Sequence, residues 1–451
     1  MPSYTLGIDI GTTSVKVAVK TKDELIERSR QHNAAEGPGI QNVAVILAVC
    51  REVIDEVVEA LPDKKLKLRT VVVCSQMHGV CTWHGQEVRE KGDRAATSLL
   101  YTWEYTGRNE EQMEQWRAAG LDANPGYGCV TLAHLEQQAK LDERHDRAGT
   151  VGDLLVAILC GDSISSHSMS EQMAFSFGLV EERRWVGPAA DGGRWQSLLP
   201  SVVSSESKAG ETTLFGKMKK PATVYVALGD LQATMYPLLT DDHRVALNLG
   251  TSSQMAFRQR GADEYEQAML ARSTCSLYPF FGSSKLIVSA SMNGGNMVQS
   301  EVEKRLGKPT NAAIASLLQA ADAFCELYPT DALATEATGL LHQERGMDKP
   351  EPVVVRRTSA TNKRPIANEE AIVAVCRRVI TNQLDLTPLA PHHEQLLLVG
   401  SAACARFAVP LKRALEQQAE AREAAIEVVK PDGSTSAAAG AAAFAWAEAG
   451  L

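Results

Sequence analysis

The chain has 451 residues, 44% hydrophobic and 22% charged, which is typical of globular proteins and predicts two or three domains. Its 46 lysines and arginines stand against 55 aspartates and glutamates with no basic block, which argues against nucleic-acid or membrane partners. Nine cysteines without a CxxC pair indicate reduced thiols, and the absence of a signal peptide or long apolar run predicts a soluble, cytoplasmic protein.

The first predicted element is a β-hairpin in TLGIDIGTTSVKVAVK, residues 5–20. Apolar residues alternate in both arms, as in half-buried strands, and the arms are joined by a turn of Gly11, Thr12 and Thr13. The alternation places Asp9 on the face opposite to Ile8, although aspartate is unfavourable in strands. An acid beside a glycine and hydroxyl turn therefore needs a chemical reason.

The following segments predict a helix, a strand and a domain boundary. Residues 43–61 are amphipathic, and residues 68–74 form an apolar run typical of a buried strand. The polar stretch ESKAGETTLFGKMKKP, residues 206–221, has the composition of a linker or surface ribbon, and we expect the boundary there. Two further strands, TVYVAL (residues 223–228) and RVALNLG (residues 244–250), open the second half.

A weak internal repeat links the two halves, because LGIDIGTTS resembles ALNLGTSSQ. Each is a strand with one short polar residue, then glycine, then hydroxyl residues. Backbone N–H groups in such turns bind phosphate, and Asp9 would then hold Mg²⁺ largely through water. Surface hairpin turns are the alternative. No Walker A sequence is present, which disfavours a P-loop enzyme.

Five motifs in order resemble the FGGY family of carbohydrate kinases. They are DIGTTSVK (residues 9–16), SQMHG (75–79), ALGDLQA (227–233), NLGTS (248–252) and SMNGGN (291–296), and the likeness continues into DGSTSAAAGAAAFA near residue 440. The resemblance implies an α/β protein of two ribonuclease-H-like domains, as in actin, hexokinase and Hsp70, with ATP and sugar in an interdomain cleft. The amino-terminal domain would span residues 1–216 and the carboxyl-terminal domain residues 222–451.

The resemblance also implies the cofactors, ATP and Mg²⁺, with Asp9 as the metal residue. The expected nucleotide-binding residues are Gly11, Thr12, Thr13, Gly250, Thr251, Ser252, Gly400 and Ser401. One departure lies in LLLVGSAACAR, residues 396–406, which keeps Gly400 but has Ser401 where the family has a further glycine.

The resemblance assigns catalysis to Asp230, which would take the proton of the attacking sugar hydroxyl. Asp230 follows a strand and a glycine, so the alternative is that it caps the N-terminus of a helix. The sequence GDLQ lacks the asparagine that typically follows this aspartate in xylulokinases, so the expected reaction is phosphorylation of sedoheptulose at O7.

Three motifs, SQMHG, YTWEYTGR and ALGDLQA, supply the expected sugar contacts. These residues are Gln76, Met77, His78, Trp103, Asp230 and Gln232. Core packing is the alternative for Trp103, a backbone-bonded histidine for His78 and a helix-surface position for Gln232. In YTWEYTGR the acid of the family pattern is replaced by Tyr105.

Three alternatives remain open from the sequence: a kinase of another ketose, a non-catalytic sugar-binding regulatory protein and, remotely, an actin-like or chaperone ATPase. We expect a monomer or homodimer. The small-residue segment 436–445 predicts a helix packed closely on a sheet at Gly440. Glu344 and Arg345 resemble a GER motif of the family, with a surface ion pair as the alternative.

Overall fold

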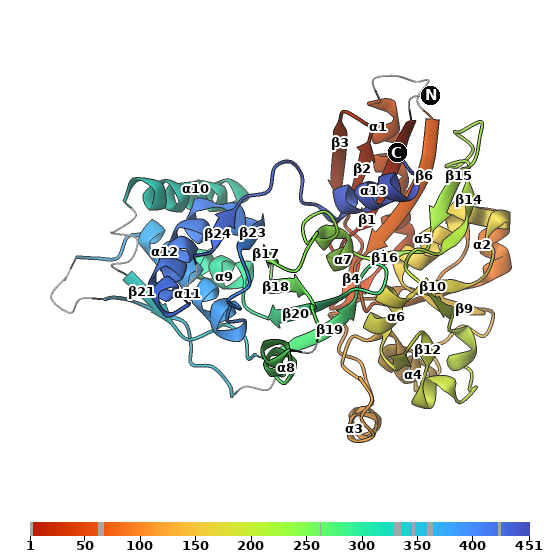
Figure 1. Ribbon diagram of the computed structural model, residues 1–451. Coiled ribbons are helices and arrows are strands. Elements are labelled where there is room, and N and C mark those ends of the chain that lie inside the picture. Colours follow the sequence, from red (N-terminus) through yellow and green to blue (C-terminus); the bar gives the residue numbers. More distant parts are fainter. Residues whose placement is uncertain are drawn as a thin grey trace. The chain divides into compact units, whose positions relative to one another are not determined.

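The computed structural model describes residues 3–61, 67–261, 263–328, 335–344, 348–358, 364–422 and 425–451 (Figure 1). It divides into two compact units. The first unit comprises residues 1–237, 279–283 and 436–451, and the second comprises residues 238–278 and 284–435.

The first unit holds a large sheet and several short strand pairs. Its strands are β1 (Ser3–Ile10), β2 (Ser14–Lys20), β3 (Leu25–Gln31), β4 (Ala35–Gly37), β5 (Ile40–Gln41), β6 (Lys67–Ser75), β7 (Cys81–Trp83), β8 (Leu100–Tyr101), β9 (Arg147–Gly149), β10 (Ser168–Ser170), β11 (Val180–Glu181), β12 (Arg184–Trp185), β13 (Ser201–Val203), β14 (Lys208–Thr212), β15 (Ala222–Tyr225) and β16 (Leu228–Gly229). Its helices are α1 (Val43–Glu59), α2 (Gly85–Lys91), α3 (Glu110–Ala118), α4 (Gly128–Gln137), α5 (Val151–Cys160), α6 (Glu171–Phe177), α7 (Asp230–Met235) and α13 (Ala437–Glu448).

The second unit contains a second large sheet and longer helices. Its strands are β17 (Arg244–Leu249), β18 (Ser253–Arg258), β19 (Cys275–Pro279), β20 (Lys285–Ser291), β21 (Thr335–Thr338), β22 (Val354–Arg357), β23 (Gln395–Gly400) and β24 (Glu427–Val429). Its helices are α8 (Glu264–Leu270), α9 (Gly295–Leu306), α10 (Asn311–Leu327), α11 (Asn368–Leu386) and α12 (Ala405–Arg422).

The two large sheets share a core of five strands with the same topology, β15-β6-β1-β2-β3 and β24-β23-β17-β18-β20, which supports the repeat. In the first, the order is β14-β15-β6-β1-β2-β3, with β1 antiparallel to β2 and parallel to β6. In the second, the order is β19-β20-β18-β17-β23-β24, with β17 antiparallel to β18 and parallel to β23. Each unit therefore places a hairpin turn next to the end of a parallel neighbouring strand, as expected for two ribonuclease-H-like domains.

The predicted helix and strands of the first unit are confirmed, but β1 is buried on both faces and not half-buried, because α13 covers the second face. The helix expected at residues 43–61 is α1, whose first turn is capped by the Asn42 side chain accepting from the backbone N–H groups of Ala44 and Val45. The expected buried strand is β6. In β1, Leu6, Ile8 and Ile10 join the core beneath α1 and α5, so Asp9 lies on the other face.

The domain boundary differs from the one predicted at residues 216–222. Strand β15 pairs with β6 of the first sheet, and β14, inside the stretch taken as a linker, pairs with β15. The first unit therefore continues to Pro237 and includes Asp230, which the sequence assigned to the second domain. A short polar edge strand has the composition of a linker, which explains the error.

Helix α13 returns to the first unit and packs on β1 and α7 through glycines (Figure 1). A Cβ added at Gly7 of β1 would lie 2.1 Å from the Ala438 carbonyl oxygen, and one at Gly440 would lie 1.8 Å from the Ala233 carbonyl oxygen. The Thr5 hydroxyl donates to the Ala442 carbonyl at 3.0 Å. Helix α13 packs closely on the sheet as predicted, but the sheet is met at Gly7, and Gly440 instead allows a close approach to helix α7.

We expect Gly440→Ala to lower the free energy of unfolding by about 1–3 kcal/mol, because the added methyl group meets backbone of α7. In an unhindered helix the same change would stabilise by about 1 kcal/mol, so the sign is diagnostic. Urea unfolding monitored by circular dichroism measures it.

Gly37→Ala is the control, since a Cβ there meets no atom within 4 Å. Equal or greater stability of Gly440→Ala would contradict the close packing of α13 on α7.

Candidate functional site

Asp9 is a buried carboxylate near the end of β1, 6% exposed. Its Oδ1 has no hydrogen-bond partner among the described residues. Burial, followed by the negative charge of Asp230, raises the pKa of Asp9 to about 7, against the opposing charge of Lys16. An orphaned carboxylate oxygen with a second acid beside it is a place for a cation.

Asp230 is the first residue of α7, and Gly229 occupies the N-cap position. The helix-capping alternative is therefore wrong for Asp230, whose Oδ1 accepts from the N–H of the next residue, Leu231, at 2.8 Å. Burial raises the pKa of Asp230 to about 6, so most of the group is ionised at neutral pH. Such a carboxylate can accept a proton.

The first turn, Gly11 to Thr13, has all three of its carbonyl groups bound by other parts of the first unit. The Gly11 carbonyl lies 3.2 Å from His32 Nε2, and the Thr13 carbonyl accepts from the His32 backbone N–H at 3.0 Å. The Thr12 carbonyl accepts from Gln41 Nε2 at 2.7 Å. Within the described ranges, the backbone N–H groups of Thr12 and Thr13 have no such partner and can bind an anion.

Thr12 also joins this turn to two of the predicted sugar contacts. Its hydroxyl accepts from the indole N–H of Trp103 at 3.1 Å and donates to Gln76 Oε1 at 3.4 Å. Gln76 in turn donates to Gln41 Oε1 at 3.2 Å. Trp103 is 39% exposed, so the core-packing alternative is wrong, and its ring is accessible to a ligand.

His78 follows β6 with an unusual backbone, at φ 72°. Its ring stacks on Tyr127, with centroids 4.7 Å apart, and its Nδ1 lies 2.8 Å from the Ser176 carbonyl oxygen. Burial lowers the pKa of His78 to about 4, so the ring is neutral at physiological pH. Because a carbonyl only accepts, Nδ1 carries the proton and Nε2 is left as an acceptor.

Met77 and Gln232 lie against Gly229, immediately before Asp230. Gln232 is fully buried, so the helix-surface alternative is wrong. Its Nε2 donates to the Pro279 carbonyl at 3.3 Å, while its Oε1 is unpartnered within the described part of the chain. Position 229 must be glycine, because a Cβ would lie 2.2 Å from Gln232 Oε1.

The second turn, Gly250 to Ser252, repeats the arrangement of the first. Its carbonyls accept from the backbone N–H groups of Gly295 (2.9 Å), Asn296 (3.0 Å) and Gly250 itself (3.0 Å). Gly294 is required beside it, because a Cβ would lie 2.4 Å from the Ser252 carbonyl carbon. The motif SMNGGN therefore supports the second turn through backbone contacts.

The side chain of Glu344 holds the SMNGGN segment, residues 291–296, by hydrogen bonds. It is 2% exposed, and its carboxylate accepts from Ser291 Oγ (2.5 Å), Asn293 Nδ2 (2.7 Å) and Asn382 Nδ2 (2.8 Å). Burial excludes the surface ion pair considered from the sequence, and Arg345 lies outside the described residues. Neutral amide and hydroxyl donors satisfy this acid.

Gly400 ends β23 beside the second turn, with φ 63° and an added Cβ only 2.7 Å from the Leu249 carbonyl oxygen. It lines a cavity of about 480 Å³ together with Cys404, Lys430 and other residues of the second unit. Ser401, predicted to contact nucleotide, is not among the lining residues. The cavity has the size of a small-molecule site.

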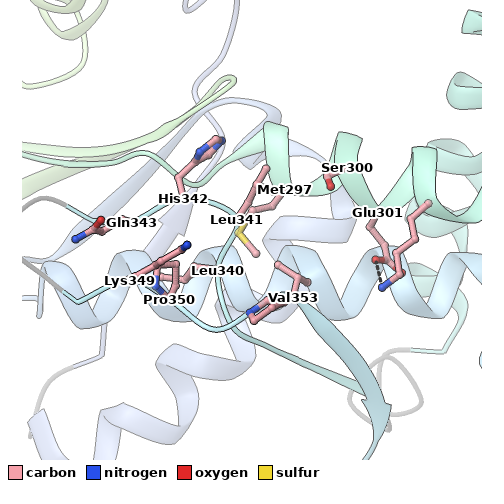
Figure 2. A pocket seen from close by; sticks show the side chains of 12 residues that line it. Met297, Ser300, Glu301, Leu340, Leu341, His342, Gln343, Lys349, Pro350 and Val353 are labelled. Atoms are coloured by element: carbon pink, nitrogen blue, oxygen red, sulfur yellow. Dashed lines mark ion pairs between the residues drawn. The ribbon is translucent and has the colours of Figure 1, made fainter. Parts of the chain in front are cut away.

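Another cavity of the second unit, about 490 Å³, lies against α9 (Figure 2). Met297, Ser300 and Glu301 face it from the helix, and Glu301 is paired with Lys304. It contains none of the residues predicted from the sequence.

His32, Gln41 and Ser176 were missed by sequence reasoning. Each of them contacts a residue far away in the chain, through a backbone or side-chain group. No local sequence pattern indicates such a contact. Tyr105 packs its ring on Tyr101, with centroids 4.8 Å apart. All nine cysteines are free thiols, and eight of them are buried, as expected.

Within the described residues, no cluster of three or more His, Cys, Asp or Glu side chains forms a self-contained metal site. In the same part of the chain, no helix is long and apolar enough to cross a membrane.

Curated relatives and solved structures resemble this chain. It is 32% identical over 329 residues to human (Homo sapiens) sedoheptulokinase and 30% identical over 323 residues to the mouse (Mus musculus) protein, in each case covering 65% of this chain and 67% of the relative. No family model matches the chain.

Among solved structures, the xylulose kinase of Rhodospirillum rubrum aligns with a TM-score of 0.72 at 15% identity, and Plasmodium falciparum glycerol kinase with ADP aligns with a TM-score of 0.71 at 16% identity. Each alignment covers 99% of this chain and 90% of the other. With the duplicated sheet topology and the sedoheptulokinase relatives, these findings show that the chain belongs to the FGGY family of carbohydrate kinases.

Proposed function

We propose that the protein transfers the terminal phosphoryl group of ATP to a ketose, converting sedoheptulose to sedoheptulose 7-phosphate. The observation that carries the proposal is the pair Asp9 and Asp230 in the first unit. Asp9 is followed by a turn whose carbonyls are bound and whose Thr12 and Thr13 N–H groups have no partner within the described ranges. The names of the human and mouse relatives support the choice of sugar.

Asp230 is the proposed proton acceptor. The sugar hydroxyl oxygen forms a bond to the terminal phosphorus of ATP, the bond from that phosphorus to the bridging oxygen breaks, and ADP leaves. The hydroxyl proton passes to the Asp230 carboxylate. A pKa near 6 keeps this group ionised at neutral pH yet basic enough to take the proton.

Asp9 is suited to Mg²⁺ because its Oδ1 is buried and unpartnered in the described structure and a second acid raises its pKa. One or two carboxylates plus phosphates and water are the usual ligands of this ion. Mg²⁺ would neutralise charge on the transferring phosphoryl group. Asp9 would hold it from the protein side.

In the first unit, the turn Gly11 to Thr13 is proposed to bind phosphate. In the second unit, the turn Gly250 to Ser252 is proposed to bind phosphate and the cavity at Gly400 the nucleoside of ATP. On the sugar side, His78 Nε2 would accept a hydrogen bond from a ketose hydroxyl, because Nδ1 is held as the donor. The exposed ring of Trp103 would cover the C–H surface of the sugar.

A coupled ADP-release assay against sedoheptulose, xylulose, ribulose, glycerol and gluconate tests the proposal. We expect the highest kcat/KM for sedoheptulose and loss of turnover in excess chelator, restored by added Mg²⁺. A higher kcat/KM for another sugar would correct the substrate. Sugar binding without any ADP release would favour a non-catalytic regulatory protein instead.

Asp230→Asn should lower kcat by about 10²–10⁴ while sugar binding survives, because asparagine is nearly isosteric but takes no proton. His78→Asn should instead raise the sugar KM by about 5- to 100-fold with little change in kcat, through loss of the ring acceptor. Asparagine suits position 78 because it tolerates a positive φ.

Steady-state kinetics and calorimetric sugar titrations separate these two effects. The reverse pattern, in which Asp230→Asn changes only KM and His78→Asn abolishes kcat, would contradict the assigned roles.

Asp9→Asn should stabilise the metal-free protein at pH 8 by about 1–4 kcal/mol and have little effect near pH 4. The pKa of Asp9 is raised on folding, so the folded state binds more protons than the unfolded state. Stability from this group is therefore present at low pH and is lost as pH rises toward about 7. Thermal unfolding across this pH range measures the difference.

Asp23→Asn, at an exposed position, is the matched control and should show no such trend. A variant Asp9→Asn that is no more stable than its parent at pH 8 would show that the Asp9 charge carries no cost in the free protein.

A further inference from the structure

Four side chains and one backbone carbonyl of the first unit form a closed ring of hydrogen bonds with a branch. Thr12 Oγ1 donates to Gln76 Oε1, Gln76 Nε2 donates to Gln41 Oε1, and Gln41 Nε2 donates to the Thr12 carbonyl. The branch is the indole N–H of Trp103, which donates to Thr12 Oγ1. Gln41 is 7% exposed and Gln76 is 3% exposed, so water competes little for these bonds.

We propose that Gln41 is a positioning residue that couples occupancy of the sugar site to the conformation of the phosphate-binding turn. This inference rests on the proposed function, since it takes Gln76 and Trp103 as sugar contacts and the turn as a phosphate site. The two bonds of the Gln41 amide go to Thr12 and Gln76. Gln41 acts through these two residues.

The direction of every bond in the ring follows from Gln41. A carbonyl only accepts, so the Gln41 amide nitrogen must face the Thr12 carbonyl, and the amide oxygen must face Gln76. The Gln76 amide nitrogen is thereby used, and its oxygen is directed to Thr12 Oγ1. Turning either amide over would set oxygen against oxygen or N–H against N–H.

The direction of the hydrogen bonds of the Thr12 hydroxyl is fixed in the same way. It has one proton, which goes to Gln76, and one of its acceptor positions is taken by Trp103. Phosphate is then left to the backbone N–H groups of the turn, which the bond from Gln41 to the Thr12 carbonyl helps to orient. The longest bond of the ring, 3.4 Å between Thr12 and Gln76, is the one a sugar hydroxyl can most easily change.

A sugar that contacts Gln76 or Trp103 therefore alters bonds that hold the turn, and a phosphate on the turn alters the sugar contacts. Such coupling is reciprocal: if sugar tightens nucleotide binding by a factor, nucleotide tightens sugar binding by the same factor. Factors of about 5- to 150-fold are usual for coupled sites.

Gln41→Glu tests the coupling with minimal change in shape. The carboxylate still accepts from Gln76, but it cannot donate to the Thr12 carbonyl, so the ring opens at the turn. Calorimetry measures the Kd of a non-hydrolysable ATP analogue with Mg²⁺, first alone and then with saturating sugar, using the sugar with the highest kcat/KM. We expect sugar to tighten the analogue by about 5-fold or more in the parent protein, and by less than about 2-fold in Gln41→Glu.

Gln196→Glu is the matched control, because Gln196 also donates its amide to a backbone carbonyl, that of Pro188 at 3.0 Å, far along the chain from these motifs. It should keep the full coupling. If Gln41→Glu fails to fold, as judged by thermal unfolding, Thr12→Val opens the same ring at the hydroxyl. That variant should also reduce the coupling factor, whereas loss of a simple phosphate contact would weaken nucleotide binding equally with and without sugar.

Coupling that survives in folded Gln41→Glu, or is absent from the parent protein although it phosphorylates the sugar, would overturn the inference and leave the proposed function standing. A parent protein that neither binds nor phosphorylates any sugar would overturn both.

Discussion

The close contact of α13 with β1 and α7 is the constraint on which the arrangement of the first unit depends. Gly7 and Gly440 remove the Cβ atoms that would otherwise keep these backbones apart. As a result the strand that carries Asp9 and the helix that begins at Asp230 are held by one small-residue helix. The effect of the Asp230 charge on the pKa of Asp9 follows from this packing.

The two turns have the same hydrogen-bonding arrangement, but different groups of the protein provide it. In both, the carbonyls are bound within their own unit, and the N–H groups of the two hydroxyl residues have no partner among the residues that the structure describes. The first turn uses side chains of His32 and Gln41, whereas the second uses backbone N–H groups at the start of α9. Side chains thus link the first turn to Gln76 and Trp103, which are proposed sugar contacts.

Much of this fold could be predicted from the sequence, because its signals are local. The alternation around Asp9, the amphipathic pattern of α1 and the small residues of α13 each specify an element and its buried face. The boundary was misplaced because β14 is a short polar edge strand. Gln41 was not identified from the sequence, because its partners come from distant segments and obey no spacing rule. Glu344 was matched to a family motif, but its buried partners Ser291, Asn293 and Asn382 could not be predicted for the same reason.

The return of α13 to the first unit has a consequence for synthesis of the chain. Residues 436–451 emerge from the ribosome long after residues 1–237, with the whole second unit between them. Until then, the β1 face around Gly7 lacks the helix that covers it and exposes apolar surface. The second unit can fold before α13 is synthesised. We therefore expect the first unit to depend most on chaperones in this interval, while its apolar surface is uncovered.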